Sequence, residues 1–238
     1  MVHYSKHPLD GCLERVRRAN EHLSELEREI GIMIEKQAHA VPFDLDPKPP
    51  HGAVNVGRPP ETFAGLRLGT LVGEIVYNLR CALDYLIYAL AELDSGAPQK
   101  RTQFPIMETA QDFARWSKTM LKGVNPGHIA AVERLQPYNG CSWTDALGAL
   151  SNMDKHRHIV PGQGRMKATV HSALETDLSR ISGAFERKAK HPLTGAEVHV
   201  KIHVVSEITF MNGAEVIRTL HELEAQVANT LRDFEPEF

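Results

Sequence analysis

The sequence predicts an α+β protein that is mainly helical, and three observations lead to this fold class. Apolar residues recur at helical spacing near both ends of the chain and in its first half. Prolines crowd the stretch between the first two helical segments, which marks it as a connection. Alternating and β-branched residues appear only late in the chain. We therefore expect a single domain over residues 1–238, in which a helical bundle (1–160) is followed by a small antiparallel β-meander (161–212) and a C-terminal helix (213–238) that packs on the bundle.

The balance of charge and the cysteine content exclude several classes of protein. The 27 basic and 30 acidic side chains nearly cancel, so no overall charge favours DNA or membrane binding. No apolar run approaches the roughly 20 residues that span a bilayer, and the first residues lack the apolar core of a signal peptide. Three scattered cysteines indicate neither a disulfide framework nor a cysteine-based zinc site. We expect a cytoplasmic protein with no membrane association and no specific DNA binding.

The first helix is predicted by one apolar seam whose members alternate three and four residues apart. The seam is Leu9, Cys12, Val16, Ala19, Leu23, Leu26, Ile30 and Met33. It predicts a helix over residues 9–38, either packed antiparallel in a bundle, which we favour, or paired in a dimeric coiled coil. Together with the apolar C-terminal helix, the seam offers more hydrophobic surface than a thin bundle covers, and this favours a homodimer.

A proline-rich connection over residues 40–62 separates this helix from the most apolar one, over residues 66–93. Helical spacing gathers one set of apolar side chains on one side: Ile75, Leu79, Ala82, Leu83, Leu86 and Leu90. The opposite side carries Glu74, Tyr77, Asn78, Arg80, Asp84, Tyr85 and Tyr88.

Shorter helices follow, and each has a recognisable start. Thr109 with Asp112 resembles a capping box. Asn125 and Pro126 place a cap and then proline at the first helical position. After an Asn-Gly turn, Ser142 opens a helix over residues 143–158.

The strand signals come next, in residues 166–174, 183–190 and 197–210. His199 and His203 share one face of the last segment, but without a third ligand a solvated face is favoured over a metal site. An apolar repeat over residues 214–234 predicts the closing helix.

Two helices carry polar residues that a plain core does not need. Arg80 and Asp84 are four residues apart and can pair on one helix surface, as can Glu74 and Asn78. In the later helix, Asn152 and His156 have the same spacing, as do Asp154 and His158. If these groups are buried between the helices, they form a network that fixes how the two helices pack.

The same residues also suit metal-independent RNA cleavage. His156 can act as base or acid toward a ribose 2′-hydroxyl, Arg80 or Arg157 can stabilise a phosphate, and Asn152 can orient either group without a cofactor. The supporting residues in this hypothesis are Glu74, Asn78, Asp84, Asp154 and Lys155. A divalent metal held by Asp84, Asp154 and His156 or His158 is a less favoured alternative. Asp154, His156 and His158 cannot all point one way from a regular helix.

Four stretches carry a family resemblance: "GEIVYNLRCALDYLIYAL", "QFPI", "LQPYNG" and "LSNMDKHR". They resemble a widespread set of uncharacterised bacterial and phage-borne proteins, over about residues 64–160. This core is also similar, more faintly, to the HEPN (higher eukaryotes and prokaryotes nucleotide-binding) superfamily. The superfamily signature is Arg, a polar residue that is often Asn, three variable residues and then His. Asn152 and His156 match it, whereas Ser151 stands where Arg is expected.

The resemblance implies a compact helical bundle that forms a homodimer. It also implies an RNA-directed protein, a metal-independent endoribonuclease of a toxin or phage-defence system, with Arg80 or Arg157 in the role of the missing Arg. The alternative is a non-catalytic dimeric binding or scaffold protein whose polar cluster is a structural network.

Overall fold

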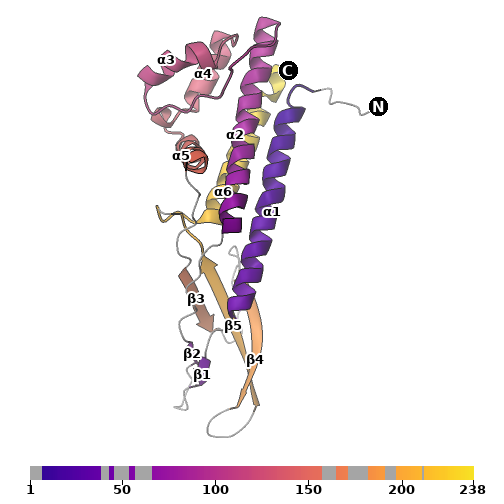
Figure 1. Ribbon diagram of the computed structural model, residues 1–238, viewed down its shortest axis with the longest axis vertical. Coiled ribbons are helices and arrows are strands. Elements are labelled where there is room, and N and C mark those ends of the chain that lie inside the picture. The colour runs from indigo at the N-terminus through magenta and orange to yellow at the C-terminus, as the bar shows by residue number, and fades with distance from the viewer. Residues whose placement is uncertain are drawn as a thin grey trace, which may run out of the picture. The chain divides into compact units, whose positions relative to one another are not determined.

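A computed structural model gives the fold (Figure 1). It describes residues 7–38, 43–45, 54–56, 66–156, 165–170, 182–190, 197–210 and 212–238. Side chains are described for residues 7–33, 35–36, 66–153, 208–210 and 212–238.

The chain divides into two compact units. Unit 1 contains Met1–Ser24, Gly69–Ile159 and Ile217–Phe238, and unit 2 contains Glu25–Leu68 and Val160–Val216. Unit 1 is the helical bundle, which confirms the mainly helical prediction for the part of the chain that the structure describes. The single-domain assignment of residues 1–238 stays a prediction.

The two long helices are α1 (Asp10–Ala38) and α2 (Leu66–Ser95). The predicted seam of α1 from Leu9 to Ile30 is 0–8 % exposed, so the chain itself buries it. Within unit 1, α1 and α2 lie side by side (Figure 1), and Arg15 of α1 donates hydrogen bonds to Asn78 Oδ1 (3.2 Å) and to the Tyr85 hydroxyl (3.1 Å). Burial of the seam by the protein's own chain fits the bundle better than the coiled-coil alternative.

The prediction that the polar residues of α2 share one outward side is only partly correct. Tyr77, Tyr85 and Tyr88 are exposed, but Asn78 and Arg80 are 7 % and 9 % exposed. Helical spacing sorts residues by polarity and therefore assigns a buried polar side chain to the surface. Asn78 is held by hydrogen bonds with Arg15 of α1 and with the Glu74 carbonyl of its own helix, and Arg80 donates one hydrogen bond to the Phe104 carbonyl.

Three short helices and one 3-10 turn connect α2 to the end of the bundle: α3 (Ala110–Met120), α4 (Pro126–Arg134), η1 (Pro137–Asn139) and α5 (Ser142–His156). The two predicted N-caps are confirmed. Thr109 Oγ1 accepts a hydrogen bond from the Asp112 amide (3.1 Å), and Asn125 Oδ1 accepts one from the His128 amide (2.9 Å). Gly140 follows η1 at φ 89°, a left-handed conformation that glycine adopts without strain.

The strands all belong to unit 2. Strands β1 (Phe43–Leu45) and β2 (Val54–Val56) form an antiparallel pair within the proline-rich connection. The other sheet contains β3 (Arg165–Val170), β4 (Ser182–Lys190) and β5 (Glu197–Glu207). Its order is β3-β5-β4 and all its pairs are antiparallel. The predicted meander is therefore not supported, because a meander pairs each strand with the next along the chain, whereas β5 is the longest strand here and pairs on both sides.

The closing helix is α6 (Val216–Phe234), followed by η2 (Glu235–Glu237). Its buried stripe contains Val216, Leu220, Leu223, Val227 and Leu231. The Phe234 ring lies 6.2 Å from the ring of His128 in α4, so the end of α6 packs on the bundle. No helix in the described part of the chain is both long and apolar enough to cross a membrane.

Candidate functional site

The segment of residues 103–108 lies on α2 without forming a helix or a strand, so its backbone groups need other partners. Arg80 Nη2 donates a hydrogen bond to the carbonyl of Phe104, and Asp84 Oδ1 accepts one from the Phe104 amide (2.9 Å). Arg80 and Asp84 themselves are 3.5 Å apart, which is the ion pair that their spacing predicts. Both charged groups thus hold the backbone of one residue, and the Phe104 ring is fully buried.

Gln136 holds the next residues of the same segment. It is fully buried, its Oε1 accepts a hydrogen bond from the Met107 amide (2.9 Å), and its Nε2 donates one to the Pro105 carbonyl (2.9 Å). The "NLRCALD", "QFPI" and "LQPYNG" stretches of the sequence therefore meet in one hydrogen-bond network. This network fits the structural interpretation of the polar cluster.

Arg80 is the most deeply buried charge of this network. Its side chain is 10 % exposed, and its guanidinium carbon lies 6.0 Å from the centre of the Phe104 ring. Burial lowers the pKa of Arg80 from its usual value, although the Asp84 carboxylate opposes this. Arginine remains charged after such a shift.

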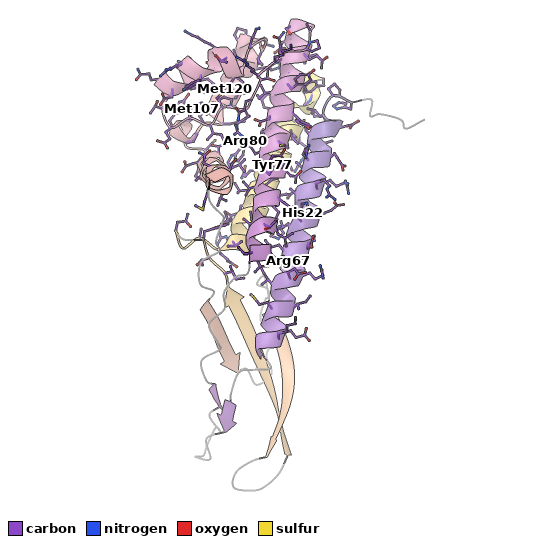
Figure 2. The ribbon with its side chains drawn as sticks, viewed as in Figure 1. His22, Arg67, Tyr77, Arg80, Met107 and Met120 are labelled. Atoms are coloured by element: carbon purple, nitrogen blue, oxygen red, sulfur yellow. The ribbon has the colours of Figure 1, made fainter. Side chains whose placement is uncertain are left out.

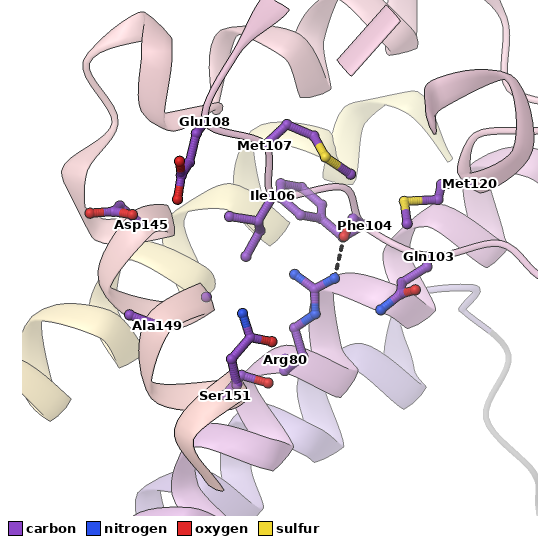
Figure 3. Close-up of a pocket in the computed structure, with 12 residues that line it drawn as sticks. Arg80, Gln103, Phe104, Ile106, Met107, Glu108, Met120, Asp145, Ala149 and Ser151 are labelled. Carbon is purple, nitrogen blue, oxygen red and sulfur yellow. Dashed lines mark hydrogen bonds between the residues drawn. The ribbon is translucent and has the colours of Figure 1, made fainter. Parts of the chain in front are cut away.

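A pocket of about 260 Å³ opens beside this network, between α2, the segment of residues 103–108 and α5 (Figure 3). Its lining residues are Arg80, Gln103, Phe104, Ile106, Met107, Glu108, Met120, Asp145, Gly148, Ala149, Ser151 and Asn152. The volume lies just below the roughly 300–1,000 Å³ of pockets for drug-sized molecules, and it suits a small ligand. Figure 2 shows Met107, Met120 and Arg80 within the whole bundle.

The structure brings together two of the four predicted catalytic residues, because Arg80 and Asn152 line the same pocket. His156 is the last residue of α5, one turn beyond Asn152, but its side chain lies outside the described residues. The same holds for the side chains of Asp154 and Lys155, and Arg157 lies outside the described residues altogether. The roles proposed for these four residues stay predictions.

Glu74 and Asn78 face α1 instead of the pocket. Asn78 Nδ2 donates to the backbone carbonyl of Glu74 (2.8 Å), and the Glu74 carboxylate lies 3.5 Å from His22 of α1. The two side chains therefore do not pair with each other as their spacing suggests. They join the contact between α1 and α2.

Sequence reasoning missed several residues of the site. Ser151, in the place of the Arg of the HEPN signature, is 7 % exposed and lines the pocket. Glu108 and Asp145 line it as well, and Asp145 lies in the first turn of α5. A usable signal for Gln136 was its place before Pro137, since a polar residue at the end of a helix often satisfies nearby backbone groups.

A second charged cluster joins α2, α4 and the C-terminus. His128 Nδ1 is 2.8 Å from Asp94 Oδ2, and its Nε2 is 3.3 Å from Glu237 Oε2. Burial lowers the pKa of His128, but the hydrogen bonds to Asp94 and Glu237 outweigh it, so the pKa lies above its usual value. Burial raises the pKa of Asp94, whereas hydrogen bonds from Asn125 and His128 lower it below its usual value.

These shifts predict a pH dependence of stability. Because the pKa of His128 is raised in the folded protein, His128 adds to the free energy of unfolding in full below its pKa in the unfolded chain, about 6.5. This stabilisation is lost as the pH rises through the pKa of His128 in the folded protein. Because the pKa of Asp94 is lowered in the folded protein, Asp94 stabilises the fold above its pKa in the unfolded chain, about 3.9. This stabilisation is lost as the pH falls through the pKa of Asp94 in the folded protein. We therefore expect the cluster to stabilise the protein most between about pH 4 and 6.5.

The test is urea unfolding at pH 6 and pH 8.5 for the wild type and His128→Gln. The wild type should lose about 1 kcal/mol more than the variant between these two values, because the charge-assisted hydrogen bonds to Asp94 and Glu237 weaken. Equal losses in both proteins would contradict a protonated His128 in the cluster.

No group of three or more His, Cys, Asp or Glu residues that could hold a metal occurs where side chains are described. The metal alternative depends on Asp154 and His156 or His158, which lie outside that part, and on Asp84, whose carboxylate already binds the Phe104 amide. Comparisons with known protein families, with curated proteins and with solved structures found no match.

Proposed function

We propose that the protein is a non-catalytic binding protein, in which the polar cluster of α2 is a packing network that builds a pocket for a small ligand. The observation that carries this proposal is the pair of hydrogen bonds to the backbone of Phe104. Its amide donates to Asp84, and its carbonyl accepts from Arg80. The two charges thereby hold the wall of the pocket in place.

Two buried polar groups in the pocket support a ligand there. Within the described residues, Arg80 Nε and Nη1 and the Ser151 hydroxyl have no hydrogen-bond partner in the protein. A polar ligand in the pocket can form hydrogen bonds with these groups directly.

A second candidate is an HEPN-like endoribonuclease acting on cytoplasmic RNA in a toxin or phage-defence system. Two features favour it: Arg80 and Asn152 line one pocket, and His156 follows Asn152 by one turn of α5. Glu108 and Asp145 line the same pocket, and their negative charge opposes the entry of an RNA phosphate backbone.

RNA cleavage in EDTA separates these two functions. The wild type, Asn152→Ala and His156→Ala should all leave a mixed RNA substrate intact, because we place no catalytic group in the pocket. EDTA-resistant cleavage by the wild type that disappears in His156→Ala at an unchanged melting temperature would contradict the proposal, since it would show a working catalytic histidine.

We further infer that the protein forms a homodimer through the tyrosine stripe of α2, defined as Tyr77, Tyr85 and Tyr88, which are 40–55 % exposed. Light scattering should give twice the monomer mass of 26.5 kDa. Tyr88→Glu should yield the monomer, because it places a charge within the proposed contact. Leu93→Glu is the matched control, since Leu93 is exposed on α2 away from the stripe. A wild-type monomer, or equal effects of both variants, would contradict this interface.

A further inference from the structure

The pocket beside Arg80 carries opposite charges at its two ends. Figure 3 shows Arg80 and Ser151 toward one end, and Glu108 and Asp145 toward the other. Glu108 and Asp145 have exposed side chains that can accept hydrogen bonds from a ligand. A ligand with one sign of charge would meet attraction at one end of this pocket and repulsion at the other.

The end near Arg80 suits a carboxylate. The Nε and Nη1 atoms of Arg80 have no acceptor among the described residues, while Nη2 binds the Phe104 carbonyl. The Nη1 group can therefore donate a charge-assisted hydrogen bond to one oxygen of a carboxylate. The buried Ser151 hydroxyl and the Asn152 amide, which line the same pocket, supply further donors.

The distance between the two ends sets the length of the ligand. Asp145 and Ser151 are six residues apart on α5, which corresponds to a rise of about 9 Å. The middle of the pocket is apolar, with Ile106 between the charged ends and Met107 and Met120 among the lining residues (Figure 3). A ligand that reaches both ends therefore needs several apolar carbons between its charges.

We propose that the pocket binds an extended zwitterion, a small molecule with a carboxylate held by Arg80 and Ser151, an ammonium held by Glu108 and Asp145, and an apolar chain between them. This inference rests on the proposed binding function and names the class of its ligand. The ammonium neutralises the acidic end, and the carboxylate accepts a hydrogen bond from the free Nη1 of Arg80.

Isothermal titration calorimetry of the full-length protein with three probes tests the proposal. The probes are 6-aminohexanoate, hexanoate, which lacks the ammonium, and hexylamine, which lacks the carboxylate. We expect 6-aminohexanoate to bind at least about tenfold more tightly than either single-charge probe, because each lost end removes one charge-assisted contact. Hexanoate or hexylamine binding as tightly as the zwitterion would overturn the ligand class and leave a binding function in place.

Variants at the two ends make the assignment specific. Glu108→Gln should weaken binding of 6-aminohexanoate about tenfold and should not weaken binding of hexanoate, because only the ammonium contacts residue 108. Ser151→Ala should weaken binding of both acids. Glu92→Gln, at an exposed carboxylate of α2 outside the pocket lining, should change neither. The proposal would be overturned if none of the three probes bound, or if Glu108→Gln and Glu92→Gln had equal effects. The RNA cleavage assay tests the non-catalytic function independently of these titrations.

Discussion

Replacing Gln136 with leucine should lower the free energy of unfolding by about 3 kcal/mol. Leucine has a similar volume but cannot accept a hydrogen bond from the Met107 amide or donate one to the Pro105 carbonyl. The part-buried Met107 amide and the buried Pro105 carbonyl therefore lose their partners. The Val132 carbonyl, which Gln136 also contacts, keeps its bond from the Leu135 amide and adds little to the loss. Urea denaturation followed by circular dichroism measures the change.

The matched control is Gln111→Leu, the same change at an exposed position of α3. It should alter stability by less than about 0.5 kcal/mol. Equal losses in the two variants would mean that Gln136 does not hold the segment of residues 103–108.

Replacing Arg80 with methionine should cost about 3 kcal/mol or more. Methionine keeps most of the side-chain volume but leaves the Phe104 carbonyl without its donor and the Asp84 carboxylate without its cation. Asp84→Asn should cost less, because the asparagine oxygen still accepts the Phe104 amide. Urea denaturation of both variants and of the double variant gives the rank order and the coupling between the two positions.

Arg115→Met is the control for Arg80→Met, because Arg115 is an exposed arginine of α3. We expect it to lose far less stability. If Arg80→Met is as mild as this control while the protein stays folded, the charge at position 80 is not structural and its role in the pocket wall is wrong.

The helices could be predicted from the sequence because their signals are local. The seam from Leu9 to Ile30 predicts α1, and the caps Thr109 and Asn125 predict where α3 and α4 begin. Burial of Arg80 and Asn78 could not be predicted, since periodicity treats every polar residue as a surface residue. Strand order is likewise not local, and β5 lies between two strands that precede it in the chain.

About half of the candidate site could be predicted. The sequence placed a polar site between the helices of Arg80 and Asn152, and these two residues do line one pocket. It did not reveal that Phe104 and Gln136 organise this pocket, because their partners are 20 to 31 residues away and no spacing rule connects them. The sequence does contain one signal: a proline follows both residues, Pro105 after Phe104 and Pro137 after Gln136. A proline interrupts regular secondary structure, so the backbone groups beside it need side-chain partners.

Amide hydrogen exchange at Phe104 and Met107 tests most directly whether side chains hold the segment that forms the pocket wall. Both amides donate to side chains, Phe104 to Asp84 and Met107 to Gln136. We expect both to exchange slowly in the wild type, within about tenfold of the core amides of α2, and we expect Met107 to lose its protection in Gln136→Leu. Exchange of both amides at the rate of an exposed loop in the wild-type protein would contradict the packing network.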